Sequence, residues 1–290
     1  MGSWRVKPKI LLTGSTSYLG TKFIELYGAK FDILGISRTD INNPVELQDF
    51  DTVKKLFLHF QPDFVIHLAA DLGRDSAISC QITIANPAVT KNLIDLALVN
   101  KTPFIFTSTE AVYGGKEQEG MYVETDSYKP RSPYGESKVI SEKDLINSGL
   151  PYLITRGHRH VGISKNFMKS KQFLNILQKI TNRENVHIDS KKIFTPVLIN
   201  NACDIFAHHI ENNSNNQNII NMGIDKATNF YDFMIDLAKE IGLDAELIKG
   251  DGNESGWPLN SSLCMKKLHE LGYPFVTYDQ LLKTIKKDVT

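Results

Sequence analysis

The chain has 290 residues, enough for one large domain or two modest ones with their own cores. Lysine and arginine together number 33, as do aspartate and glutamate, so the formal net charge at pH 7 is zero. This balance argues against a broadly basic nucleic-acid-binding protein and gives no reason to expect binding to an anionic membrane surface. No apolar run reaches the roughly 18 residues of a membrane-spanning helix, and no secretion signal is evident, so we expect no membrane partner and a cytoplasmic location.

The three cysteines, Cys80, Cys203 and Cys264, lie far apart in the sequence. They form neither a CxxC pair nor a spacing typical of metal ligands, so we predict reduced thiols and no metal site. Reduced thiols are typical of a reducing compartment, which agrees with the cytoplasmic location.

In the first half of the chain, short apolar runs alternate with helical stretches. The runs predicted as strands are 10–13, 31–36, 63–70, 103–109 and 151–156. The helices predicted between them are 21–28, 53–60, 86–99 and 133–146. Strands separated by helices form βαβ units on a parallel sheet, and nearly continuous apolar strands suit a sheet covered on both faces. We therefore predict an α/β fold with a Rossmann-type, doubly wound parallel sheet.

After about Gly162 the pattern changes. Helices are predicted at 167–181, 199–210, 231–241 and 278–287, with one short strand at 219–222 and a solvated asparagine-rich loop at 211–218. We expect residues 1–162 to form the sheet domain and residues 163–290 to form a smaller mixed lobe, with some strand exchange between the two.

A glycine-containing loop follows the first predicted strand. The segment from Gly14 to Gly20 (GSTSYLG) connects this strand to a helix, which is the context that a dinucleotide-binding fingerprint requires. In such a loop the helix N-terminus binds a pyrophosphate. Ser17 stands where the pattern has its middle glycine, so it either narrows the approach to the phosphate or contributes a hydroxyl. The alternative is a plain turn between strand and helix.

Ser37 and Arg38 end the second predicted strand, about two dozen residues after Gly14. An acidic residue at this place would bind a ribose 2′-hydroxyl, whereas an arginine suits a 2′-phosphate and can lie flat on adenine. We therefore expect NADP(H) to be preferred over NAD(H). The alternative is a surface arginine.

A threonine, a tyrosine and a lysine follow in an order that indicates redox chemistry. Thr109 ends the fourth strand, and Tyr134 and Lys138 share one face of a helix that Ser132 and Pro133 begin. A lysine ammonium near a phenol lowers the phenol's pKa, so Tyr134 could give or take a proton while a hydride moves at the adjacent carbon. Thr109 would hydrogen-bond the same substrate oxygen.

The Tyr-x-x-x-Lys spacing alone is weak support, since it also occurs at Tyr18 and Lys22. We interpret that second match as chance, because it lies inside the glycine loop. The order of features gives the Tyr134 match more weight. The glycine loop, Ala69-Ala70 after the third strand, Ser108-Thr109 after the fourth strand and then the Tyr/Lys helix make coincidence a poor explanation.

With these features the chain resembles the extended short-chain dehydrogenases/reductases, the NAD-dependent epimerase/dehydratase family. Within that family it is most similar to the dTDP-4-dehydrorhamnose reductases, through the segment 258–261 followed by Lys267-Leu268 and through Asn166-Phe167. The segments that carry the resemblance span almost the whole chain and are 13–20, 62–70, Asn86, 106–114, 134–138, 156–162 and 257–263.

The resemblance implies roles for individual residues. The catalytic residues would be Thr109, Tyr134 and Lys138. The cofactor site in the first domain would contain Gly14, Thr16, Ser17, Tyr18, Leu19, Gly20, Ser37, Arg38, Glu46, Leu47, Leu68, Ala69, Ala70, Tyr134 and Lys138. The substrate would contact Ser108, Thr109, Glu110, His158 and Arg159. For His158 and His160 the alternative is a structural role behind the fifth strand.

The resemblance also narrows the reaction. Dehydratases of the family carry Asp-Glu after the catalytic threonine, where this chain has Glu110-Ala111, and relatives of GDP-fucose synthase carry a cysteine after the serine pair, where this chain has none. NAD(P)H-dependent reduction of a nucleotide-linked 4-keto-6-deoxy sugar needs only a hydride donor and the Thr/Tyr/Lys set. A nucleotide-sugar 4-epimerase stays open, and so does a non-catalytic NADP-binding regulatory subunit.

The expected partners follow from the same resemblance. The substrate would be a nucleotide sugar, bound by the smaller lobe. Relatives pair through the helices equivalent to 86–99 and 133–146, which implies a homodimer. The apolar residues Leu93, Leu96 and Leu98 are equally explained by packing on the sheet.

Overall fold

The computed structural model describes residues 7–41, 44–72, 81–114, 120–164, 171–212, 215–251 and 259–289. The predictions for Cys80, for the helix start at Asn166-Phe167 and for Trp257-Pro258 lie outside these residues. None of the described helices is long and apolar enough to cross a membrane.

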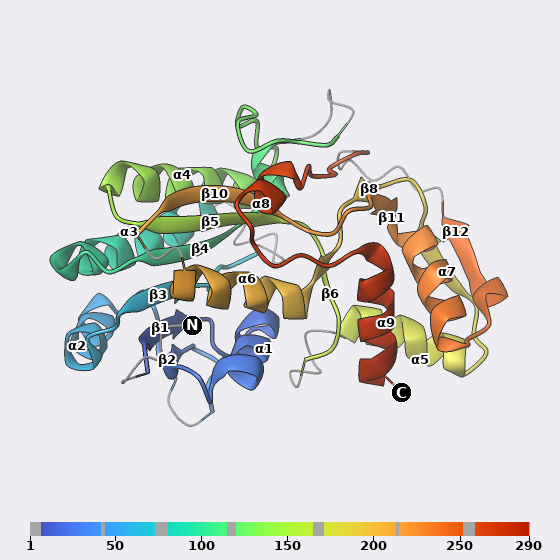
Figure 1. Ribbon diagram of the computed structural model, residues 1–290, viewed down its shortest axis with the longest axis horizontal. Coiled ribbons are helices and arrows are strands. Elements are labelled where there is room, and N and C mark those ends of the chain that lie inside the picture. Colours follow the sequence, from blue (N-terminus) through green and yellow to red (C-terminus); the bar gives the residue numbers. More distant parts are fainter. Residues whose placement is uncertain are drawn as a thin grey trace.

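A six-stranded sheet forms the centre of the molecule (Figure 1). Its strands lie in the order β10-β5-β4-β3-β1-β2, and every pairing is parallel. The predicted Rossmann-type sheet is therefore confirmed. The strands are β1 (Lys9–Thr13), β2 (Asp32–Ile36), β3 (Phe64–His67), β4 (Phe104–Thr109), β5 (Tyr152–Gly157) and β10 (Gln217–Met222).

The register of the sheet aligns the carboxyl ends of its strands. Thr13 at the end of β1 pairs with Ile36 of β2 and with His67 of β3, and Thr109 at the end of β4 pairs with Gly157 of β5. β2 lies on one side of β1 and β3 on the other, so the winding direction reverses at β1. Open parallel sheets bind ligands beyond the carboxyl ends of their strands at such a reversal.

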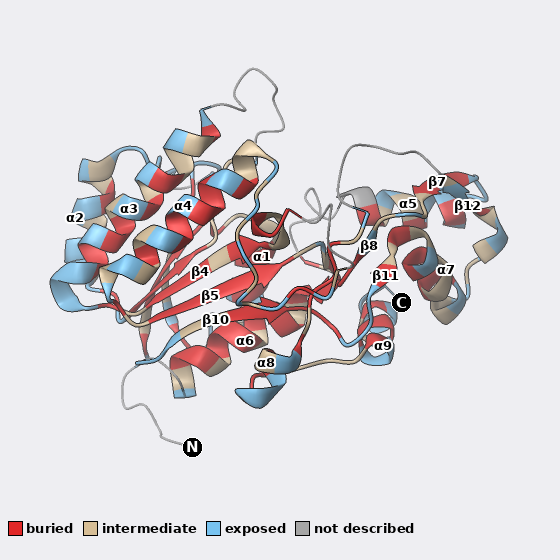
Figure 2. Ribbon diagram, turned by 90° about the horizontal axis from the view of Figure 1, so that it is seen from above, coloured by how far each residue is buried: buried red, intermediate tan, exposed pale blue. Residues whose placement is uncertain are grey.

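Helices cover both faces of the sheet (Figures 1 and 2). Successive strand residues point to opposite faces, so Ile10 and Leu12 pack in one core cluster and Leu11 packs in another. The helices on the first face are α1 (Tyr18–Tyr27) and α6 (Ile199–Asn212), and those on the second are α2 (Phe50–Phe60), α3 (Ile82–Asn100) and α4 (Pro133–Ser148).

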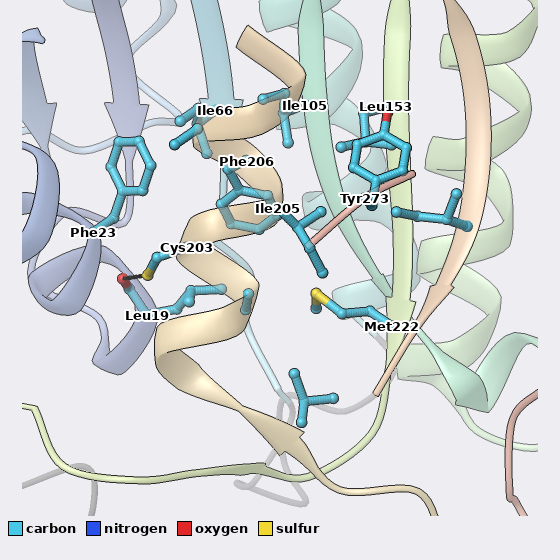
Figure 3. Packing of buried hydrophobic residues seen from close by; sticks show 14 of the residues in the cluster. Leu19, Phe23, Ile66, Ile105, Leu153, Cys203, Ile205, Phe206, Met222 and Tyr273 are labelled. Carbon is cyan, nitrogen blue, oxygen red and sulfur yellow. Dashed lines mark hydrogen bonds between the residues drawn. The ribbon is translucent and has the colours of Figure 1, made fainter. Parts of the chain in front are cut away.

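Helix α6 fills the first face with apolar side chains (Figure 3). Its Phe206 packs on Phe23 of α1 with ring centroids 6.3 Å apart, and both rings are fully buried. Burying a phenylalanine contributes about 1.5–3 kcal/mol relative to leaving it in water. Cys203 lies on the same helix, buried and free, as the sequence predicts for this thiol.

A second core lies beyond the sheet. In this part of the molecule the structure differs more from the elements predicted from the sequence. The helices α5 (Lys171–Thr181), α7 (Phe230–Ile241) and α9 (Tyr278–Val289) agree with the predicted ones to within a few residues, where described. The sequence misses strands of only two to four residues, because so few residues show no periodicity. These are β6 (His160–Val161), β7 (Val186–Asp189), β8 (Ile193–Phe194), β9 (Val197–Leu198), β11 (Thr228–Asn229) and β12 (Ile248–Asp251); α8 (Lys266–Glu270) and the 3₁₀ turns η1 (Glu110–Val112) and η2 (Ala245–Leu247) are short as well.

The chain after residue 162 also contributes to the large sheet. Strand β10 pairs with β5 over its full length, from Gln217 opposite Tyr152 to Met222 opposite Gly157. Helix α6 covers the same sheet. The division of the chain at residue 162 stays a prediction, and the sheet domain draws on residues from both sides of it.

Helix α4 is fixed to the sheet by a buried ion pair. The guanidinium Nη2 of Arg156 on β5 lies 2.6 Å from Oε2 of Glu142 on α4, and the two side chains are 1% and 0% exposed. The hydroxyls of Tyr128 and Ser108 donate to the same carboxylate, and Tyr113 accepts a hydrogen bond from Arg156. A buried pair with this many additional hydrogen bonds compensates the desolvation of its charges.

We expect Arg156→Met to lower the free energy of unfolding by about 3–5 kcal/mol, because it leaves the Glu142 carboxylate buried without its cation. The matched control is Lys91→Met, which breaks the exposed pair with Asp95 and should cost less than about 1 kcal/mol. Urea denaturation of both variants measures the two values. Equal losses of unfolding free energy in the two variants would show that burial does not determine the cost of breaking an ion pair.

Candidate functional site

The predicted site residues gather at the carboxyl edge of the sheet. The glycine loop follows β1, Ser37 follows β2, and Leu68 to Ala70 follow β3. Thr109 ends β4, and His158 comes directly after β5. The parallel register is what brings these segments together, because it places the end of every strand at one edge.

The glycine loop lies tightly against the end of β3. Gly14 has φ +71°, a conformation that side chains disfavour, and its N–H donates to the carbonyl of Ile36 at 2.8 Å. A Cβ at Gly14 would lie 2.9 Å from the backbone nitrogen of Ala69, and one at Gly20 would lie 2.3 Å from the carbonyl oxygen of Gly14. Only glycine leaves room for these approaches.

Ser17 serves as the N-cap of α1. Its hydroxyl accepts a hydrogen bond from the backbone N–H of Gly20 at 3.0 Å. The helix consequently begins at Tyr18, three residues earlier than predicted. Remaining N–H groups of a helix's first turn attract anions, so this end of α1 suits a phosphate group.

A pocket of about 260 Å³ opens beside this loop. It lies beyond the ends of β1, β2 and β3, where the winding of the sheet reverses. Most of the predicted cofactor residues line it, namely Gly14, Thr16, Ser17, Ser37, Arg38, Glu46, Leu47, Leu68, Ala69 and Ala70. A glycine cradle, a helix N-terminus and apolar walls fit an extended dinucleotide.

Other residues predicted for the cofactor lie elsewhere. The Tyr18 hydroxyl donates to the carbonyl of Gly162 at 2.6 Å, and Leu19 is buried in the core under α6. Gly20 permits the close packing of α1 against the loop. Tyr134 and Lys138 lie on α4, outside the lining of the pocket.

The sequence misses several lining residues. Ala85, Asn86 and Val89 occupy one face of α3, and the Asn86 side chain binds the backbone of Asp71 through two hydrogen bonds of 2.9 Å. Helical spacing could have grouped these α3 residues, but only the packing of α3 shows which face meets the pocket. The other lining residues that were missed are Thr39, Val45, Gln48, Asp71, Gln81 and Ile82.

Three hydroxyl groups cluster where β2 ends. Thr16 Oγ1 lies 2.6 Å from Ser37 Oγ and 2.6 Å from Thr39 Oγ1. Arg38 is exposed beside them and forms no ion pair with any described residue. Several donors and one cation at a pocket wall provide the chemistry that binds a phosphate group.

Lys138 lies under the site as a buried cation. Its Nζ donates to the carbonyl of Thr107 at 2.7 Å and lies 4.5 Å from the ring centre of Phe106 and 5.8 Å from that of Tyr134. Burial lowers the pKa of Lys138 to about 7, while the charge of Glu142 acts in the opposite direction. Burial therefore weakens the preference of this amine for its charged form.

The structure reverses one expectation for Tyr134. Burial raises the pKa of its phenol above the usual value of about 10, and the charge of Glu110 raises it further. The expectation that Lys138 lowers this pKa is wrong for the chain alone, because desolvation of the phenolate dominates. Tyr134 is held in its protonated form.

Thr109, Glu110 and His158 form a hydrogen-bonded chain. The Thr109 hydroxyl donates to Glu110 Oε2 at 2.7 Å, and His158 Nε2 lies 3.0 Å from Glu110 Oε1. Burial alone would raise the pKa of Glu110, but the facing His158 and the hydrogen bonds to the carboxylate outweigh it and hold that pKa below its usual range. Glu110 is therefore a carboxylate.

Ser108 does not join this chain. Its side chain points to the other side of β4, because neighbouring strand residues alternate, and its hydroxyl donates to Glu142. Ser108 is 4% exposed, so the structure places it in the buried network and not beside Thr109.

Arg159 lies at the exposed side of the site. Its guanidinium carbon is 4.1 Å from the ring centre of Phe230 and 5.5 Å from that of Phe194. Stacking leaves the edge of a guanidinium available for hydrogen bonds. His160 nearby is different, since burial lowers its pKa to about 4 and keeps it neutral, which agrees with a structural role. Among the described side chains no group of three or more His, Cys, Asp and Glu is arranged to hold a metal ion.

Comparison with known proteins identifies a family. The family model described as RmlD substrate binding domain matches residues 8–290. The dTDP-glucose 4,6-dehydratase of Haemophilus influenzae is 30% identical over 193 residues, which cover 53% of this chain and 56% of the relative. The dTDP-4-dehydrorhamnose reductase of Aggregatibacter actinomycetemcomitans is 27% identical over 170 residues, which cover 56% and 55%. The chain thus spans about half the length of these curated relatives.

Among solved structures, the dTDP-4-dehydrorhamnose reductase of Bacillus anthracis in complex with NADP superposes with a TM-score of 0.82. The superposition covers 98% of this chain and 99% of that chain, at 17% sequence identity. At 17% identity this similarity is evidence for a shared fold only.

We expect Gly14→Ala to destabilise the protein more than Gly242→Ala does. Both glycines have a positive φ, of 71° and 80°, so alanine costs each about 1 kcal/mol or more in backbone strain. Only the Cβ at position 14 would also collide with Ala69, because nothing lies within 4 Å of a Cβ at position 242. Urea denaturation measures both free energies, and equal losses would refute the tight fit of the loop.

Proposed function

Because the chain belongs to the RmlD substrate binding domain family, we propose that it reduces the C4 ketone of a nucleotide-linked 6-deoxy sugar with NADPH. The observation that carries this proposal is that Nζ of Lys138 lies 5.8 Å from the ring centre of Tyr134 and binds strand β4, which Thr109 ends at the sheet edge that also bears the glycine-lined pocket. These are the groups that a carbonyl reduction needs, and the resemblance assigns them that task.

The pocket suits a nicotinamide dinucleotide. Gly14, Thr16 and Ser17 would hold the pyrophosphate at the N-terminus of α1, and Leu68 to Ala70 would line the path toward Tyr134. Lys138 would hold the nicotinamide ribose. When bound, the reduced nicotinamide supplies the hydride for C4.

The end of β2 supports a preference for NADPH. Ser37 and Thr39 supply hydroxyl groups and Arg38 a guanidinium at one wall of the pocket. A 2′-phosphate offers acceptor oxygens and negative charge, which match these donors, whereas a free 2′-hydroxyl is better matched by a carboxylate.

Tyr134 would protonate the C4 oxygen as the alcohol forms. Reduction requires a phenol that still carries its proton, and burial together with Glu110 keeps Tyr134 in that form. Dehydration would need a second acid or base after Thr109. Ala111 stands at that position and has no titratable group.

The remaining assignments concern the substrate and the assembly. Arg159, stacked on Phe230, would bind the diphosphate of the nucleotide sugar, and the smaller lobe around the second core would cover the sugar. We propose a homodimer through α3 and α4, where Ile84 and Ile140 are exposed. A cytoplasmic location is supported by the free thiols Cys203 and Cys264.

We expect the protein to oxidise NADPH in step with the loss of dTDP-4-dehydrorhamnose, and Tyr134→Phe to abolish turnover while NADPH still binds. The variant removes the proton donor and leaves the pocket unchanged. Absorbance at the NADPH band measures turnover, and fluorescence titration measures binding. Tyr231→Phe in the second core is the control and should retain activity.

Two results would contradict this function. Interconversion of C4 epimers without net NADPH oxidation would indicate a 4-epimerase. Tight NADPH binding with no oxidation across a panel of nucleotide 4-keto sugars would indicate a regulatory subunit.

We expect Arg38→Met to weaken NADPH binding by about ten- to a hundredfold and to leave NADH binding nearly unchanged. A hydrogen bond to a charged group contributes about 1.5–3 kcal/mol, and only NADPH carries the 2′-phosphate. Dissociation constants for both cofactors check the expectation. The control is Arg183→Met, in the smaller lobe, which should bind both cofactors as the unmodified protein does. An equal loss of affinity for both cofactors in Arg38→Met would refute the assignment.

A further inference from the structure

The Thr109 hydroxyl has a defined set of hydrogen bonds. Its O–H group donates to Glu110 Oε2 at 2.7 Å, and its oxygen accepts a hydrogen bond from the backbone N–H of Ala111 at 3.2 Å. A hydroxyl has one proton and two lone pairs. With these two partners, Thr109 retains one lone pair for a ligand and no proton.

Glu110 is held from both ends of its carboxylate. Oε2 accepts from Thr109, and Oε1 lies 3.0 Å from Nε2 of His158. The His158 ring in turn packs on Phe194, with ring centroids 5.1 Å apart. Rotation of the carboxylate would break one of the two contacts, so Glu110 is fixed in place.

The charge of Glu110 determines the direction of the Thr109 proton. Only 11% of the Glu110 side chain is exposed, and the facing His158 keeps the pKa of its carboxyl group low. A carboxylate can only accept hydrogen bonds. The proton between the two residues therefore belongs to Thr109 and is engaged by Glu110.

We infer that Glu110 is a positioning residue that makes Thr109 a hydrogen-bond acceptor toward the substrate. The inference rests on the proposed function, in which Thr109 meets the oxygen on C4. A ketone oxygen has no proton to donate, whereas the hydroxyl formed by reduction does. The site consequently binds the alcohol more tightly than the ketone, and the proton on the C4 oxygen comes from Tyr134 alone.

The carboxylate of Glu110 acts on both Thr109 and Tyr134. It accepts a hydrogen bond from the Thr109 hydroxyl, and its charge favours the protonated form of Tyr134. The first effect favours the C4 hydroxyl over the ketone, because only the hydroxyl can donate to Thr109, whereas the second keeps Tyr134 protonated until the hydride reaches C4. Glu110 thus biases the bound equilibrium toward the alcohol without touching C4.

The test compares two ligands by calorimetry, dTDP-rhamnose with its C4 hydroxyl and dTDP-4-dehydrorhamnose with its C4 ketone. All proteins carry Tyr134→Phe and saturating NADP⁺, so that no turnover occurs. We expect Glu110→Ala to lower the ratio of alcohol affinity to ketone affinity by about tenfold, the size of one hydrogen bond. Glu110→Gln should retain most of the ratio, because its amide oxygen still accepts the Thr109 proton.

A double-mutant cycle shows whether Glu110 acts through Thr109. Thr109→Val should remove the preference for the alcohol, and adding Glu110→Ala to it should change nothing further. The matched control is Glu136→Ala, an exposed glutamate on α4, which should leave the ratio unchanged.

Several outcomes would overturn the inference. An unchanged ratio in Glu110→Ala would do so, and so would equal losses in Glu110→Ala and Glu110→Gln. An equal loss of affinity for both ligands in Glu110→Ala would show that Glu110 has a purely structural role. If Glu110→Ala does not fold, a preference for the alcohol that survives Thr109→Val still refutes the inference. Failure of the parent protein to bind either ligand would refute the proposed function itself.

Discussion

The position of helix α4 depends on the buried carboxylate of Glu142. This carboxylate pairs with Arg156 of β5 and accepts from Ser108 of β4, so one side chain ties the helix to two neighbouring strands. Tyr134 and Lys138 lie two turns and one turn earlier on the same helix. Their places above the strand ends therefore follow from an ion pair formed further along the helix, and the charge of Glu142 also favours the ammonium form of Lys138.

The parallel sheet adds a second constraint, which explains how a neutral chain can bind anionic ligands. Its strands end at one edge, so a few donors from distant segments meet there: the N-terminus of α1, Arg38 and Arg159. The zero net charge of the chain says nothing about this local arrangement. Anion binding in this architecture depends on where the donors lie and not on how many the chain contains.

The sequence predicted most of the large sheet and its helices, because their periodicity and apolar runs are local signals. It also predicted the cap at Ser132 and the wall of the pocket near Ser37 and Ala69. It could not predict the strands of two residues in the second core, nor the face of α3 that meets the pocket, because tertiary packing decides both. The expected direction of the Tyr134 pKa was wrong for the same reason, since burial in the folded chain and the charge of Glu110 raise it.

Consecutive residues of β4 show how one strand divides its polar groups between fold and chemistry. Ser108 donates a hydrogen bond to Glu142, and Thr109 donates one to Glu110, on opposite sides of the strand. Each carboxylate is held by a basic partner that β5 or the loop after it supplies, Arg156 for one and His158 for the other. A shift of the β4 register by one residue would turn the Ser108 and Thr109 side chains to the opposite sides of the strand and separate Ser108 from Glu142. The pairing of β4 with β5 therefore determines both how firmly α4 is held and to which partner the Thr109 hydroxyl donates.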